Sequence, residues 1–68
     1  MKLSDLRKKA GLSQRELAKN IGITGPAIAQ YEKKKRLPNL KIVGKLALAL
    51  NVSKQDIIDC FSEEKEAK

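Results

Sequence analysis

The residues Ser13-Gln14-Arg15-Glu16 mark the start of a helix more firmly than any other local pattern in this 68-residue sequence. A serine hydroxyl that accepts from the amide three residues on, and a glutamate that reaches back to the serine amide, form a capping box. Leu12 and Leu17 stand where a hydrophobic staple joins the entering chain to the helix. Gly22 can adopt the left-handed conformation that ends a helix in a tight turn. A short helix is therefore predicted between the capping box and this glycine.

Apolar residues at helical spacing predict four further helices and no strands. The expected helices span residues 3–10, 13–21, 39–50 and 53–61, with a short third helix that begins at 26 and ends in the basic run 33–36. Ser53 and Asp56 form a second, weaker capping box at the start of the last helix. Thr24 or Gly25 can cap the third helix. Proline disfavours helical geometry in the residue before it, which favours Gly25 as the cap and Pro26 as the first helical residue. The predicted apolar stripe of the fourth helix consists of Leu40, Val43, Leu46, Ala47 and Leu50.

The length limits this arrangement to one domain with one hydrophobic core. We expect an all-α domain over residues 1–68, with its core over about 3–61 and a polar tail, 62–68, that frays. The single Cys60 excludes an internal disulfide and is expected to be a small apolar filler or an interface residue. Without histidine there is no Cys/His zinc site and no imidazole base. No metal or cofactor is expected, and an enzyme is the least expected class of function.

The basic residues are concentrated in the first half of the chain. Residues 1–36 carry ten lysines and arginines against three acidic residues, whereas residues 37–68 carry five of each. The whole net charge of +7 therefore lies in the first half. Such a charge is typical of a surface that binds phosphate, most often in nucleic acid and less often at an anionic membrane. The longest apolar run, 46–50, is too short to cross a membrane and no signal peptide is recognisable, so we expect a cytoplasmic protein.

Two short helices joined by a glycine turn, with lysines after the second, form the pattern of a helix-turn-helix. Ala18 is small where the second helix of the pair crosses it, Gly22 turns the chain and Ile28 fills the angle between the helices. The sequence resembles the lambda-repressor and Cro-like helix-turn-helix family, regulators of the xenobiotic-response-element type. The segments that carry this resemblance are 11–18, 22–24, 28–32, 38–40 and 49–53. The resemblance covers about residues 3–61. It implies a five-helix DNA-binding domain whose third helix enters the major groove, commonly as a homodimer on a palindromic operator.

The resemblance also implies roles for individual residues. The positions that face bases are Gly25, Pro26, Ala27, Ala29 and Gln30. Only Gln30 has an amide suited to adenine, while the alanines can meet thymine methyl groups. The positions that face phosphate are Ser13, Gln14, Thr24, Lys33, Lys35 and Arg36. Helix N-termini and lysines both attract phosphate, which agrees with these roles.

The same resemblance implies an ion pair and one departure from the family. Arg7 and Glu32 match an internal ion pair that ties the first helix to the third. Lys34 stands where the family often has glycine, so a left-handed residue with some strain is expected there.

Several of these residues also have plainer interpretations. The basic run 33–36 is alternatively a solvated loop, and Gln30 an ordinary surface residue. Tyr31 is expected in the core, because it shares a face with Ile28. Leu48 is either a lone exposed leucine or part of a partner surface. A C-terminal homodimer interface is predicted from the apolar residues Ile57, Ile58, Phe61 and Leu48.

The expected function is that of a sequence-specific regulator of transcription that binds double-stranded DNA. We expect a homodimeric repressor of bacterial or phage type, associated with the nucleoid when bound. The alternative is an antitoxin-like or bridging module for protein interaction with a partly repurposed helix-turn-helix, which the apolar start Gly25-Pro26-Ala27 would suit. A membrane-surface role ranks third, because the basic charge does not lie on one long amphipathic helix.

Overall fold

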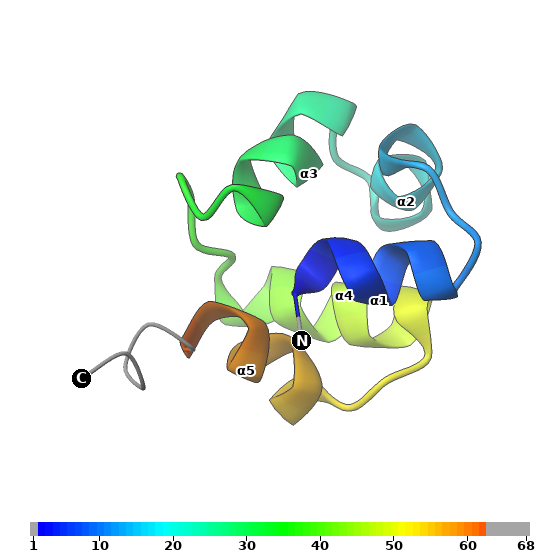
Figure 1. The fold of residues 1–68 in the computed structure, drawn as a ribbon. Helices are drawn as coiled ribbons and strands as arrows, with labels where there is room; N and C mark the ends of the chain where they lie inside the picture. The colour runs from blue at the N-terminus through cyan, green and yellow to red at the C-terminus, as the bar shows by residue number, and fades with distance from the viewer. Residues whose placement is uncertain (1, 63–68) are drawn as a thin grey trace.

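A computed structural model describes residues 2–62, and the expected tail over 63–68 lies outside this range. The described residues form helices and no strands. The helices are α1 (Leu3–Lys9), α2 (Gln14–Ile21), α3 (Gly25–Glu32), α4 (Leu40–Leu50) and α5 (Lys54–Ser62) (Figure 1). Ser62 was expected in the tail but belongs to α5, where its hydroxyl donates to the carbonyl of Ile58 at 3.0 Å. The all-α fold predicted from helical spacing is confirmed.

The predicted capping residues set the ends of α2 and the start of α5. The Ser13 hydroxyl accepts from the Glu16 amide at 3.0 Å, and the Glu16 carboxylate accepts from the Ser13 amide at 2.8 Å. Gly22 ends α2 in the left-handed conformation, with φ of 78°. Ser53 and Asp56 form the same reciprocal pair before α5, with distances of 3.1 and 3.2 Å. Local sequence therefore determines these boundaries, because two amides at the start of each helix find a side-chain acceptor three residues away.

The start of α3 corrects the prediction. Thr24 is the N-cap, and its hydroxyl accepts from the Ala27 amide at 3.3 Å. Gly25 is the first helical residue and Pro26 the second. Proline excludes helical geometry before it partly through a clash with the preceding Cβ, which glycine lacks. Gly25 can therefore be helical, and the threonine takes the cap.

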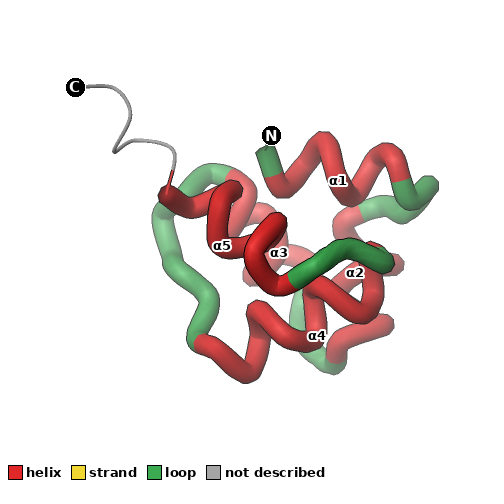
Figure 2. Tube along the Cα trace, turned by 90° about the horizontal axis from the view of Figure 1, so that it is seen from below, coloured by secondary structure: helices red, strands yellow, loops and turns green. Residues whose placement is uncertain are grey.

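The five helices bury one core. Figure 1 shows α2 and α3 above α1, α4 and α5, and Figure 2 views this lower layer from below. α2 packs chiefly on α3, and α4 chiefly on α5. The buried hydrophobic residues are Leu3, Leu6, Leu17, Ala18, Ile21, Ile28, Tyr31, Val43, Leu46, Ala47, Leu50, Ile57 and Cys60. No helix within residues 2–62 is long and apolar enough to cross a membrane.

One member of the predicted apolar stripe of α4 lies outside this core. Leu40 is 82% exposed, and Leu37 just before the helix is exposed as well. The first turn of α4 thus starts beyond the packed layer, and the buried stripe begins at Val43. Ile42, which was not predicted, packs against the core instead.

Candidate nucleic-acid interface

The α2–α3 pair is held at its corner by small and apolar residues. The left-handed Gly22 reverses the chain, and the Ile23 amide then donates to the Ala18 carbonyl at 2.9 Å. Ala18 and Ile28 are buried between the helices. Because nothing larger than a methyl group occupies position 18, the two helices approach closely. The corner therefore fixes how α3 projects from the domain.

The exposed side of α3 carries few polar side chains. Pro26 and Gln30 are exposed, and Gly25, Ala27 and Ala29 are half-buried. Pro26 and Gln30 stand four residues apart, so they share one face of the helix. Gln30 is the one amide side chain on this helix. The first turn thus presents backbone and apolar atoms, and the second turn presents a group suited to hydrogen bonding.

A half-buried polar network joins three helices beside the end of α3. Arg7 Nε lies 2.6 Å from Glu32 Oε2, and Arg7 Nη1 donates to the Leu12 carbonyl at 2.8 Å. Gln14 Nε2 donates to Glu32 Oε1 at 2.9 Å. The structure thus brings together Arg7 and Glu32, which the sequence paired, and adds Gln14 to them. The network places the first turn of α2 beside the last turn of α3.

Gln14 has a second donor in this position. A side-chain amide carries two N–H groups, and one of them is directed to Glu32. The residue is half-buried, so the carboxylate fixes its orientation while part of the amide stays accessible. The amides of the first turn of α2 lie next to it, at the positive end of the helix dipole. This corner of the molecule therefore suits an anion.

The basic run 33–36 follows directly after the last residue of α3. Lys33 caps the helix, Lys34 is left-handed with φ of 61°, and the Lys35 amide donates to the Gln30 carbonyl at 2.9 Å. Side chains 33–36 are all exposed. The Arg36 guanidinium lies 5.9 Å from the centre of the Tyr31 ring, within the range of a cation–π contact. These cations follow directly after Glu32, the residue that Gln14 contacts.

Arg15 is a candidate that the sequence prediction missed. It is exposed on the first turn of α2. An ideal Cβ built on Gly25 would lie 3.6 Å from Arg15 Cγ and 3.9 Å from Arg15 Cα. The arginine stem therefore lies directly beside the first turn of α3. Its position three residues before Ala18, on the face that packs on α3, was the available signal.

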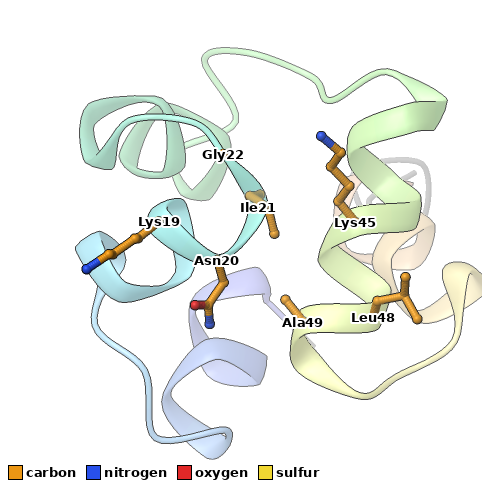
Figure 3. Close-up of a pocket in the computed structure, with 7 residues that line it drawn as sticks. All are labelled: Lys19, Asn20, Ile21, Gly22, Lys45, Leu48 and Ala49. Carbon is orange, nitrogen blue, oxygen red and sulfur yellow. The ribbon is translucent and has the colours of Figure 1, made fainter.

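The four apolar residues assigned to a dimer interface do not share one environment. Ile57 is fully buried in the core, which corrects its assignment to a surface. Ile58 is 37% exposed, and Phe61 is half-buried against the core. Leu48, on α4, is 86% exposed. It lines an open pocket of about 620 Å³ with residues of α2 and its turn, among them Lys19, and no residue of α5 lines this pocket (Figure 3).

The corner between α2 and α3, with its exposed recognition face and basic flank, defines a helix-turn-helix domain. A Helix-turn-helix family model matches residues 3–57. The chain belongs to the Cro/C1-type helix-turn-helix family, which confirms the resemblance seen in the sequence.

Curated relatives support the same family. One from Archaeoglobus fulgidus, named an uncharacterized HTH-type transcriptional regulator, is 36% identical over 63 residues, covering 93% of this chain and 87% of its own. A second from that organism, with the same name, is 33% identical and covers 93% and 90% of the two chains. The uncharacterized HTH-type transcriptional regulator YgzD from Bacillus subtilis is 30% identical over 56 residues, covering 82% and 85%.

Proposed function

We propose that this chain is a sequence-specific regulator of transcription that binds double-stranded DNA with α3 in the major groove. The observation that carries the proposal is the juxtaposition made by the Gln14–Glu32 hydrogen bond of 2.9 Å. This bond joins the N-terminus of α2 to the end of α3, and the cations follow that end along the chain. Phosphate-binding groups thereby flank a helix whose exposed face is small and apolar enough to approach base edges. The relatives named as transcriptional regulators support this proposal.

Phosphate binding would come from two places. The first is the start of α2, where Ser13 and the second N–H of Gln14 accompany free helix amides. The second is the loop with Lys33, Lys35 and Arg36, whose charges would replace counterions along the DNA backbone. Thr24 is exposed at the start of α3, and its hydroxyl proton is available to a phosphate while its oxygen accepts from the helix.

Base recognition would rest on the face of α3. Gln30 can donate and accept at the two adenine positions of the major groove, and Ala27 and Ala29 can pack on thymine methyl groups. Gly25 and Pro26 would let the helix backbone approach the groove closely. The expected preference is therefore for A·T pairs below the second turn of α3.

We also propose that the protein acts as a homodimeric repressor on a palindromic operator. The partner surface would centre on α5, where Ile58 is exposed and Phe61 half-buried. A small domain buries a modest core, so association through such a surface would add stability. The two half-sites would lie about 10 to 10.5 base pairs apart, one turn of DNA. A dimer bound across a promoter would block transcription.

Selection of bound fragments from random double-stranded DNA tests the function directly. The proposal predicts enrichment of a palindrome, and binding to it that weakens steeply as salt rises. A protein that enriches no sequence, binds no DNA at low salt and is purified with a protein partner would instead support the module for protein interaction.

A further inference from the structure

The first turn of α3 lacks any side chain that can read a base by hydrogen bonding. Gly25, Pro26 and Ala27 occupy this turn, and none carries a side-chain donor or acceptor. Recognition helices of this kind contact base edges with their N-terminal residues. Gln30 stands more than one turn further along the helix and reads a different base pair. The first turn of α3 is therefore left without hydrogen-bonding readout of a base, although Ala27 can still pack on a thymine methyl group.

Arg15 lies beside the position from which a side chain of residue 25 would project. The Cγ of Arg15 is 3.6 Å, and its Cα 3.9 Å, from the ideal Cβ position of Gly25. The arginine side chain is longer than the asparagine and glutamine side chains that read adenine from a recognition helix. From that origin it reaches the space in front of the first turn of α3. An open pocket of about 460 Å³ lies along this junction, lined by Arg15, Lys19, Ile23 and Gly25 among others.

The charge of Arg15 has no ion-pair partner among residues 2–62. Arg7 and Glu32 form the ion pair found in residues 2–62, and no carboxylate of these residues lies within salt-bridge distance of Arg15. The neighbouring Glu16 carboxylate is bound to the Ser13 amide. The positive end of a helix dipole disfavours a nearby guanidinium. A hydrogen-bond acceptor outside the protein would therefore stabilise the exposed Arg15 side chain.

We propose that Arg15 is a specificity-determining residue that reads a guanine from α2, in place of the first turn of α3. This inference rests on the proposed DNA-binding function and names the base it recognises. The guanidinium would donate to O6 and N7 of one guanine, the bidentate contact to which its planar fork is suited. A Cβ at Gly25 would be in ordinary van der Waals contact with the Arg15 stem, so the arginine lies immediately beside this turn. Each half-site would then contain one required G·C pair beside the A·T pair read by Gln30.

The experiment selects binding sites with the wild type, Arg15→Ala, Arg15→Lys and the control Lys19→Ala, and then measures affinities over a salt series. The wild type should enrich a palindrome with one G·C pair in each half-site. Arg15→Ala should lower the preference for that pair by about 5- to 150-fold and leave the other positions unchanged. Arg15→Lys should keep most of the overall affinity and lose the preference, because an ammonium cannot make the bidentate contact. The control Lys19→Ala should keep the preference for the G·C pair.

Three results would overturn the inference. If Arg15→Ala weakens all sequences alike and flattens the dependence of log affinity on log salt by about 0.9 per subunit, Arg15 binds phosphate and reads no base. An unchanged G·C preference in Arg15→Ala places recognition elsewhere, while the DNA-binding function stands. If the wild type binds no DNA, the proposed function fails first and this inference falls with it. Thermal melting of each variant identifies loss of fold, which an exposed arginine replaced by alanine should not cause.

Discussion

Glu32 Oε1 accepts from Gln14 Nε2 at 2.9 Å while Glu32 Oε2 lies 2.6 Å from Arg7 Nε, so one carboxylate connects the first turn of α2 to α1. Glu32 is the last residue of α3 and its side chain is 9% exposed. Each oxygen of the Glu32 carboxylate therefore accepts a hydrogen bond, one from the Arg7 guanidinium and one from the Gln14 amide, at a site with little access to water. The network fixes the angle of α3 from the opposite end to the Gly22 turn. It also orients Gln14, the residue proposed to meet phosphate.

Replacing Arg7 by alanine should destabilise the domain strongly. Glu32 would lose its charged partner while still nearly buried, and breaking such a pair costs about 3 to 5 kcal/mol. The control Lys8→Ala removes an exposed charge from the same helix and should change stability by less than about 1 kcal/mol. Urea unfolding of both variants measures the difference. Equal stabilities would show that the Arg7–Glu32 contact does not hold the fold.

Replacing Lys34 by glycine should stabilise the domain. Lys34 has φ of 61°, a left-handed backbone that costs a residue with a side chain about 1 to 2 kcal/mol. Glycine adopts it without that cost, so the free energy of unfolding should rise by about 1 kcal/mol. Lys35→Gly removes the same charge from a residue without a positive φ and should not raise stability. A higher melting temperature for Lys35→Gly than for Lys34→Gly would refute the argument from backbone strain.

Gln30→Ala and Lys35→Ala should separate base recognition from phosphate binding. An amide pair with adenine discriminates by about 1 to 3 kcal/mol, so Gln30→Ala should relax preference at one base pair of each half-site and leave the salt dependence unchanged. Lys35→Ala in both subunits should flatten the slope of log affinity against log salt by about 2 and weaken all sequences alike.

Titration of operator and scrambled DNA over a salt series gives both quantities. If Gln30→Ala weakens both DNAs equally, then Gln30 reads no base. Specificity would in that case come from alanine–methyl contacts, from Arg15 or from the shape of the DNA.

Ile58→Asp should prevent the proposed dimer without unfolding the monomer. Ile58 is 37% exposed, so a carboxylate there stays hydrated in the monomer but would be buried against a partner subunit. Lys41→Asp, at an exposed position of α4, serves as the control and should leave association unchanged. Sedimentation equilibrium distinguishes the two. A wild type that remains monomeric at high concentration, with and without operator, rules out the α5 interface.

The sequence predicts features that depend on neighbours along the chain. The caps Ser13 and Ser53 and the Gly22 turn were predicted because their partners lie within three residues, and the structure has them there. Thr24 was one of two candidate caps, and Gly25 was favoured over it because the proline rule was applied without its exception for glycine.

Features that depend on packing between residues far apart in the sequence were not predicted from local patterns. Leu40 has the spacing of a core residue, but spacing does not show where the neighbouring helices end. Ile57 is apolar like Ile58, and only the packing of α5 shows that one is buried and the other half-exposed. In the sequence, Arg15 contributed only to the net charge. Its closeness to Gly25 arises from the crossing of two helices, which local patterns do not show. The Arg7–Glu32 pair was assigned through the family resemblance, since 25 residues separate its members.

The central claim is tested most directly by the affinity of the protein for its selected palindrome and for a scrambled duplex between about 50 and 200 mM salt. We predict binding to both duplexes at low salt, a steep fall with rising salt, and an affinity for the palindrome at least about 1,000-fold higher. Equal affinity for the two duplexes, or no binding to either at the lowest salt, would contradict the assignment of a sequence-specific DNA-binding regulator.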